Sequence, residues 1–230
     1  MTHVERLPVD VELAREQWAA YVETLVRENF RVIEVDPAEE CPDSVFIEDM
    51  LVVHDGLAVV TRPGAGSRRA ELAAAEAAIR ELGFPVAHID APETLDGGDV
   101  LIAGGTVYVG TGARTSAGAA AQLRALLDAP VVEIPIAGIL HLKSAVTALP
   151  DGTLVGFAPI VPTAVAEFRP VPEPTGGQVV ILDANRVLVA ADCPRTAELY
   201  SDLGHEPVVV DIGEFQKLEG CVTCLSVLVP

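Results

Sequence analysis

The sequence predicts an α/β fold built from repeated units, in the form of a five-unit β/α propeller that closes between its two ends. Stretches of strand, turn, strand, helix and strand recur, and their starts lie about 40 to 50 residues apart, a period typical of radial repeats. The fifth stretch begins at Cys224 and stops after one strand, whereas the chain opens with a helix and a strand that belong to no complete unit. Joining the two ends therefore completes a ring and removes exposed sheet edges.

The first elements precede the repeats. Residues 9–29 carry apolar side chains at helical spacing, and residues 30–35 are typical of a short buried strand. The apolar stripe that predicts the helix comprises Val11, Leu13, Ala14, Trp18, Tyr21, Leu25 and Val26.

Turn signals separate the strands of the repeated units. Asp55-Gly56, Gly104-Gly105 and Asp151-Gly152 each lie between two apolar runs and predict hairpins. Ser67 is expected to cap the helix that follows it. The predicted strands are 50–53, 57–61, 84–89, 100–103, 106–110, 131–136, 145–149, 153–157, 179–182, 186–190, 208–211 and 225–229, and the predicted helices are 68–82, 116–127 and 196–203.

Composition limits the functions that the chain can have. Acidic residues number 34 against 15 basic ones, a net charge of −19, which argues against nucleic acid as a partner because phosphate binding needs clustered Lys and Arg. That charge indicates a soluble acidic surface or the steering of a cationic ligand. Residues 1–6 resemble no signal peptide, and the longest apolar stretch, 154–166, is too short to span a bilayer. We therefore expect a cytoplasmic protein without a membrane partner.

Cys224 lies where a loop meets the last predicted strand. Such a Cys can be a nucleophile, although buried unreactive cysteines are the commoner case. Cys221 and Cys224 also form a C-x-x-C pair, which raises a redox motif or a zinc site as alternatives. A redox Cys normally opens a helix, and zinc would require a second pair, whereas Cys41 and Cys193 are isolated. A single working thiol is therefore the preferred interpretation.

Polar residues at the starts of the units are expected to meet on the axis of the ring. Each has a simpler explanation, since acids beside Gly97-Gly98 are typical of turns and a lone His is often structural. Together, however, a thiol, an imidazole and several carboxylates are the parts of nucleophilic catalysis. These residues are Glu48, Asp49, Asp96, Asp99, His141 and Cys224.

Six motifs in order along nearly the whole chain resemble the dimethylarginine dimethylaminohydrolases. This family belongs to the pentein superfamily of five-fold pseudo-symmetric α/β propellers, so the resemblance implies one pentein catalytic domain over residues 1–230. It also implies hydrolysis of Nω-methylated arginines to citrulline and methylamine or dimethylamine. The motifs are CPDSVFIED at 41–49, TRPGAGSRR at 61–69, TLDGGDVL at 94–101, GART at 112–115, LHLKS at 140–144 and TCLSV at 223–227.

The resemblance implies a role for each motif residue. Cys224 would be the nucleophile, His141 the general acid and base, and Asp96 its orienting carboxylate, while Cys221 would be structural. Carboxylates bind the planar guanidinium cation well, and the matching positions are Asp43, Glu48 and Asp49. Arg68 and Arg114 match residues that hold the substrate α-carboxylate, although either could be an ordinary solvated Arg. Leu218 matches a position whose carbonyl takes the α-amino group, and no metal or organic cofactor is implied.

The chain departs from the family pattern at its start. Family members usually begin with a strand and a mobile loop that closes over the substrate, whereas here the first helix is expected near Val9. We therefore expect the N-terminal strand and most of this lid to be missing. The missing strand would leave residues 225–229 with an open edge. Three alternatives stay open: a partner chain covers this edge, as in a homodimer, the sequence is truncated, or the protein is less active and less stable.

Two other functions stay open at this point. The chain could be a related deiminase that acts on arginine or another guanidine, and the Arg pair then favours a free α-amino acid over agmatine. It could also be a non-catalytic pentein of the kind represented by a ribosome anti-association factor, against which Cys224, His141 and Asp96 together argue.

Overall fold

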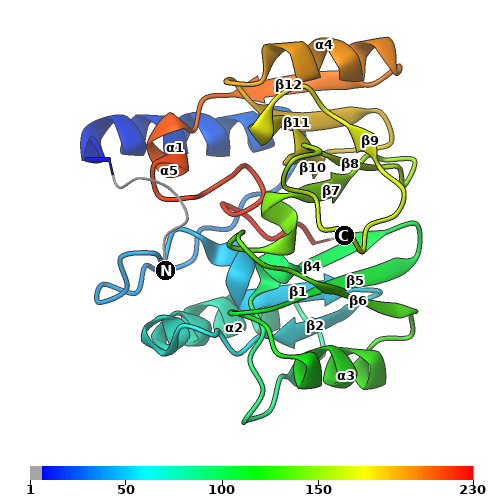
Figure 1. The fold of residues 1–230 in the computed structure, drawn as a ribbon. Helices are drawn as coiled ribbons and strands as arrows, with labels where there is room; N and C mark the ends of the chain where they lie inside the picture. The colour runs from blue at the N-terminus through cyan, green and yellow to red at the C-terminus, as the bar shows by residue number, and fades with distance from the viewer. Residues whose placement is uncertain (1–6, 230) are drawn as a thin grey trace. The chain divides into compact units, whose positions relative to one another are not determined.

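The computed structural model describes residues 7–229, which form an α/β fold (Figure 1). Residues 1–6, on which the expectation of no signal peptide rests, lie outside the described part. The chain divides into two compact units. The first unit holds the chain up to Val32, Gly138–Leu140 and Ser144–Thr223, and the second unit holds Ile33–Ala137, His141–Lys143 and the chain from Cys224 on.

The described chain contains four three-stranded sheets that share one pattern. In each sheet a hairpin supplies two antiparallel strands, and a third strand joins the second in parallel. The residue types at the turn account for the first hairpin. Asp55 and Gly56 have φ of 45° and 77°, the left-handed values that a two-residue turn requires and that Asp and Gly tolerate. Four of the expected repeats are therefore present as sheets.

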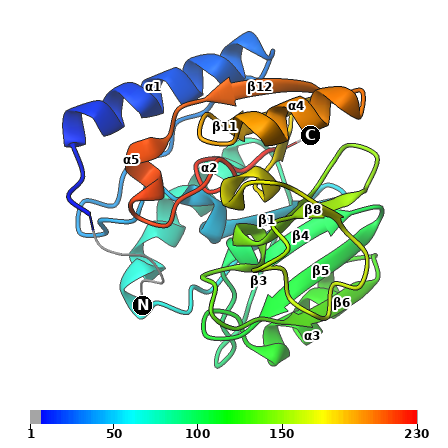
Figure 2. The same cartoon turned by 45° about the horizontal axis from the view of Figure 1, so that its top comes forward.

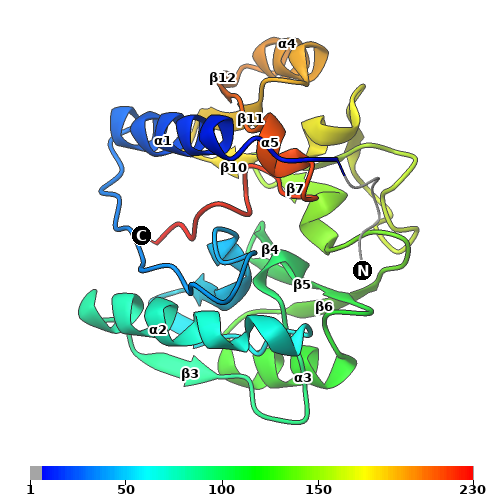
Figure 3. The ribbon, with the colours of Figure 1, turned by 90° about the vertical axis from the view of Figure 1, so that its left-hand side faces the viewer.

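The second unit contains two of these sheets and two longer helices. Its two apolar cores, one centred on Val59 and Leu123 and the other on Met50 and Ile79, lie between the strands and the helices. Helix α3 packs against β5 and β6 (Figure 3), and α2 packs against β2. The elements are β1 (Leu51–His54), β2 (Leu57–Val60), α2 (Leu72–Glu81), β3 (Val86–His88), β4 (Val100–Ala103), β5 (Thr106–Thr111), α3 (Ala117–Leu126) and β6 (Val131–Pro135).

The first unit contains the other two sheets and three helices. Helix α4 packs against β12, and α1 contacts both α5 and β12 (Figure 2). Its core includes Leu149, Val189 and the fully buried Tyr200. The elements are α1 (Val11–Arg27), β7 (Val146–Ala148), β8 (Leu154–Gly156), β9 (Arg169–Pro170), β10 (Val180–Ile181), β11 (Arg186–Ala190), α4 (Pro194–Asp202), β12 (Glu206–Val210) and α5 (Gly213–Gln216).

The first predicted helix is present, but its buried face differs from the expected stripe. Asp10 caps α1 by accepting hydrogen bonds from the N–H groups of Glu12 and Leu13. Val11 and Val26 are more than half exposed, whereas Gln17, Tyr21, Thr24 and Leu25 are buried. Hydrogen-bonded polar side chains therefore share the inner face, which apolar spacing alone does not reveal.

Three local predictions are wrong. Residues 30–35 and 225–229 have no ladder partner among the described residues and are not strands, because a strand needs a neighbour that sequence patterning does not supply. Val227 and Val229 instead pack against the core around Met50. Ser67 does not cap a helix, since it lies inside the 3₁₀ helix Gly66–Glu71, and α2 begins only at Leu72.

Within residues 7–229, no helix combines the length and the apolar character that crossing a bilayer demands.

Candidate active site

Two 3₁₀ helices of the second unit bring the candidate site together. Ile47–Met50 carries Glu48 and Asp49, and Gly97–Asp99 follows Asp96. A side chain at Gly97 would collide with the carbonyl of Glu48, and one at Gly98 would place Cβ 2.6 Å from Nδ1 of His141. The two glycines therefore permit close approach of these segments to the His141 ring, rather than a left-handed turn.

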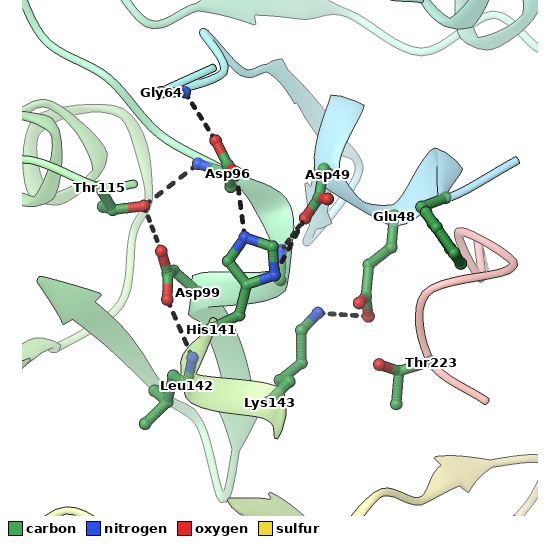
Figure 4. Close-up of polar contacts among 12 residues, drawn as sticks. Glu48, Asp49, Gly64, Asp96, Asp99, Thr115, His141, Leu142, Lys143 and Thr223 are labelled. Carbon is green, nitrogen blue, oxygen red and sulfur yellow. Dashed lines mark hydrogen bonds and ion pairs between the residues drawn. The ribbon is translucent and has the colours of Figure 1, made fainter. Parts of the chain in front are cut away.

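His141 lies between two buried carboxylates (Figure 4). Its Nε2 is 3.0 Å from Oδ2 of Asp96, and its Nδ1 is 3.7 Å from Oδ1 of Asp49. Burial would lower the pKa of His141, but the charge of Asp49, the hydrogen bond to Asp96 and the charge of Asp99 raise it to about 10. The ring is therefore a cation at neutral pH, and both of its nitrogens carry protons.

Asp49 stays ionised although it is buried. Its Oδ1 accepts a hydrogen bond of 2.9 Å from the Gly98 N–H, and its Oδ2 accepts one of 2.5 Å from Nη1 of Arg68. Burial would raise the pKa of Asp49, but the charges of His141 and Arg68 and these hydrogen bonds hold it below its usual value. Asp49 thus presents a permanent negative charge beside the imidazolium.

Arg68 is buried and bound by carboxylates on both sides. Its Nε and Nη2 donate to Glu71 at 3.0 and 2.7 Å, and Nη2 also donates to the Asp43 carbonyl at 3.2 Å. Burial would lower the pKa of Arg68, but the hydrogen bonds to Glu71 and the charge of Asp49 raise it. The expected ligand of a substrate carboxylate therefore also fixes Asp49.

Asp96 is fully buried and held at both oxygens. Oδ1 accepts a hydrogen bond of 2.8 Å from the Gly64 N–H, while Oδ2 faces Nε2 of His141. The expected turn acid is therefore aimed at the imidazole by a backbone donor 32 positions away. This placement suits an orienting carboxylate.

Glu48 connects the cluster to Cys224. The Glu48 N–H donates to the Cys224 carbonyl at 3.2 Å, and the Glu48 carboxylate forms a 2.6 Å ion pair with Nζ of Lys143. Cys224 is half-buried, and it belongs to the same unit as His141. The backbone of the expected nucleophile is therefore attached to the segment that carries Asp49.

The remaining predicted site residues differ in exposure. Arg114 is half-buried and directly precedes Thr115, whereas Asp43 is exposed and touches Arg68 only through its carbonyl. Leu218 lies in the first unit just after α5, with 41% of its surface exposed. Direct contacts thus join Asp49, Arg68, Asp96 and His141. Glu48 contacts Cys224 through its backbone, and Leu218 is placed in the other unit.

Sequence reasoning missed three contributors to this cluster. Glu71 binds Arg68, Lys143 binds Glu48, and the Thr115 hydroxyl accepts a hydrogen bond from the Asp96 N–H. Lys143 lies in the motif LHLKS, two residues after His141, and Thr115 lies in the motif GART, directly after Arg114. This closeness in sequence to predicted site residues is the signal that could have identified them. Glu71 is three residues after Arg68 on a helical turn, a spacing that favours ion pairs.

The cysteines favour a single working thiol over a cysteine pair. All four lie in the described part of the chain and none forms a disulfide. Cys221 is buried in the first unit, where its sulfur lies 3.2 Å from the Thr223 hydroxyl.

The one group of described side chains with metal-ligand spacing is Asp49, Asp96 and His141, whose donor atoms lie within 4.8 Å of one another.

Comparison with known proteins gives relatives over the whole chain, although no family model matches. The N(G),N(G)-dimethylarginine dimethylaminohydrolase of Streptomyces coelicolor is 59% identical and covers 99% of this chain and 90% of its own length. The enzyme of the same name from Pseudomonas aeruginosa, solved as a cysteine-to-serine variant with citrulline, gives a TM-score of 0.90 at 30% identity, covering 98% and 91% of the two chains. A solved dimethylarginine dimethylaminohydrolase with a histidine-to-glycine change, in an adduct with S-methyl-L-thiocitrulline, gives a TM-score of 0.89 at 30% identity, covering 98% of this chain and 92% of that chain.

Proposed function

Since this chain belongs to the dimethylarginine dimethylaminohydrolase family, we propose that it hydrolyses Nω-methylated arginines to citrulline and dimethylamine or methylamine. The observation that carries the proposal is the position of the His141 ring between the buried carboxylates of Asp49 and Asp96. It supplies a proton donor beside negative charge that suits a guanidinium.

The first step uses the thiolate of Cys224. Its sulfur attacks the guanidinium carbon and forms a C–S bond, which gives a tetrahedral adduct. Asp49, Glu48 and Asp43 bind the flat cation, and the positive charge of the bound substrate favours the thiolate form. Glu48 is paired with Lys143, so the substrate shares this carboxylate with the ammonium group.

The second step moves a proton from His141 to the departing amine. The raised pKa of His141 means that the ring holds this proton at neutral pH. The C–N bond breaks, the methylated amine leaves, and a thiouronium on Cys224 remains. Neutral His141 then takes a proton from water as the water oxygen adds to the thiouronium carbon. The added hydroxyl loses its remaining proton to solvent as the C=O bond forms, the C–S bond breaks with its electron pair returning to the sulfur of Cys224, and citrulline is released. Asp96 holds the ring through both steps.

The amino-acid end of the substrate requires separate ligands. We assign its α-carboxylate to Arg114 and Arg68 and its α-amino group to the Leu218 carbonyl, as the motifs imply. Arg68 has a second task, because its hydrogen bond to Asp49 keeps that carboxylate ionised and in place. The sulfur and the proton carrier come from side chains, so the scheme draws on no cofactor.

We further propose that the four sheets, α1 and residues 224–229 make up a five-fold propeller that works as one catalytic domain. Four repeats of the same strand pattern support this proposal. A homodimer and a cytoplasmic location belong to the same set of proposals. Light scattering would test the homodimer, and a single cooperative unfolding transition would test the single domain.

The test of the activity is citrulline production from asymmetric dimethylarginine, monomethylarginine and arginine. The parent should act on the methylated substrates, Cys224→Ser should lose activity by about 10,000-fold or more, and Cys221→Ser should keep it. Equal loss in both variants would replace the single thiol with a cysteine pair. Citrulline from arginine alone would make the protein a deiminase, and none from any substrate would favour a non-catalytic protein.

A further inference from the structure

One buried pair, Asp99 and Thr115, holds the backbone on both sides of the Asp96–His141 contact. Asp99 accepts a hydrogen bond of 2.9 Å from the Leu142 N–H at Oδ1 and one of 2.6 Å from the Thr115 hydroxyl at Oδ2. The Thr115 oxygen in turn accepts a hydrogen bond of 3.1 Å from the Asp96 N–H. Figure 4 shows this chain of bonds running around the ring of His141.

The contacts of Asp99 are not those of a turn acid. Its side chain is 0% exposed, and its partners lie 16 and 43 positions away in the sequence. Burying a carboxylate lowers folding stability unless hydrogen bonds compensate, and the two hydrogen bonds that Asp99 accepts offset this cost. The carboxylate joins three segments whose spacing the proposed chemistry depends on.

The same pair fixes the backbone that presents Arg114. The Gly112 N–H donates to the Thr115 carbonyl at 2.9 Å and closes a tight turn around Arg114. Gly64 lets this turn approach, because a Cβ there would lie 2.5 Å from the Arg114 carbonyl oxygen. Gly64 also donates its N–H to Asp96, so the positions of the turn and of the orienting carboxylate both depend on this residue.

We propose that Asp99 and Thr115 are the positioning pair of this site. They set the separation between Asp96 and His141, and they fix the position of the Arg114 backbone relative to both residues. The Thr115 hydroxyl serves at once as donor and acceptor, so serine can replace it and valine cannot. The kinetic part of this inference rests on the proposed function.

The charge of Asp99 also acts on His141. The carboxylates that face the ring are Asp49, Asp96 and Asp99, and each favours its protonated form. Burial raises the pKa of Asp99 to about 6, against the opposing influence of His141, Thr115 and the Leu142 N–H. At neutral pH Asp99 is therefore mostly ionised, and both of its oxygens are available as acceptors.

Thr115→Val and Thr115→Ser test the geometry. Because displacement of reacting groups by about 1 Å can cost about 100-fold in rate, Thr115→Val should lower kcat by about that factor, and it should raise KM through Arg114. Thr115→Ser should stay within about threefold of the parent, since it keeps the hydroxyl. An unchanged kcat in Thr115→Val, with the variant folded, would overturn the proposal.

Thr147→Val is the matched control. Thr147 is also buried, and its hydroxyl also both donates and accepts: it donates to the Gly177 carbonyl at 2.9 Å, where Thr115 donates to a carboxylate, and it accepts the Val179 N–H at 3.1 Å. It lies in the first unit among backbone segments without a proposed chemical role. It should lower Tm as Thr115→Val does while kcat stays unchanged, whereas equal kcat losses in the two variants would reduce Thr115 to a structural role.

Asp99→Asn gives a readout without turnover. The His141 pKa, followed by NMR of the imidazole in the unliganded protein, should fall because one of the three facing carboxylates is removed. An unchanged His141 pKa would overturn the electrostatic part of the inference. If the parent makes no citrulline, the proposed function fails, but this titration still decides whether Asp99 acts on His141.

Discussion

The cluster around His141 and the segment that leads into Cys224 are held in place by different means. In the second unit, Asp49, Asp96 and His141 are buried charges that fix one another. In the first unit, two neutral side chains of α1 bind backbone groups of the segment from α5 to Thr223. Gln17 accepts the Glu214 N–H at 2.8 Å, and the Tyr21 hydroxyl donates to the Val222 carbonyl at 2.8 Å.

The difference separates charged contacts, which act on the chemistry, from neutral contacts, which act on geometry alone. The partners of Gln17 and Tyr21 lie 197 and 201 positions away, so α1 ties down the far end of the chain two residues before Cys224. Charge concentrated in one cluster can shift pKa values and bind a cation, whereas neutral hydrogen bonds only fix geometry. Mutations in the cluster around His141 should therefore change catalytic activity most. Mutations in the contacts between α1 and the segment from α5 to Thr223 should change stability and the position of the backbone that leads into Cys224.

Among changes to the residues that hold these two regions in place, the largest effect is expected from Asp49→Asn. This change removes a carboxylate from the guanidinium site, takes a charged partner from Arg68 and lowers the pKa of His141. Loss of one such electrostatic contact typically costs about 100- to 1,000-fold, so kcat/KM for methylarginine should fall by that order.

Asp183→Asn is the control for Asp49→Asn. Asp183 is a partly exposed acid in the first unit that also pairs with an arginine, Arg186, at 2.8 Å. Its loss should leave kcat/KM within about twofold, because surface pairs contribute little. A similar loss in both variants would mean that general stability, and not the charge at Asp49, limits activity.

A second prediction concerns stability against pH. The folded pKa of His141, about 10, lies above its unfolded value near 6.5, so its contribution to stability is complete below that lower value and is lost as pH rises toward about 10. The Tm of the parent, measured in thermal melts, should therefore fall as the pH rises from about 6.5 to about 10. His141→Gln should show a flatter Tm profile there, and parallel profiles would contradict the raised pKa.

The smallest effect is expected from Tyr21→Phe. The change deletes one buried hydrogen bond, worth about 1 kcal/mol, and should lower Tm by about 2–4 °C. It should also lower kcat a few-fold, because the Val222 carbonyl near Cys224 loses its anchor. Tyr200→Phe removes an equivalent bond to the Gly176 carbonyl and should match the Tm loss with kcat unchanged. Equal kcat in the two variants would remove Tyr21 from the positioning account.

Local chemistry explains which parts of the fold the sequence predicts well. The hairpin at Asp55-Gly56 and helix α3 match their predicted bounds closely, because turn residues and periodicity act over short range. Residues 225–229 fail as a strand because a ladder needs a partner, which no local pattern encodes. The helix expected from Arg68 begins instead as a 3₁₀ segment, where Arg68 reaches the distant Asp49.

The candidate site divides in the same way. The acids and His141 could be predicted because unusual charges in specific motifs point to chemistry, and the similarity to solved family members confirms the family that six motifs predicted. Tyr21, Thr115 and Lys143 could not be assigned a task. They are ordinary residue types whose importance arises only from the partners that folding brings to them.

The most direct test of the account is rapid-quench mass spectrometry of the protein mixed with asymmetric dimethylarginine. We predict a transient covalent adduct with the mass of the substrate less dimethylamine, located at Cys224 by fragmentation of the peptide that contains Cys221 and Cys224, and its absence in Cys224→Ser. Citrulline formation by Cys224→Ser at the parent rate, or an adduct on Cys221 instead, would contradict a single nucleophile at residue 224.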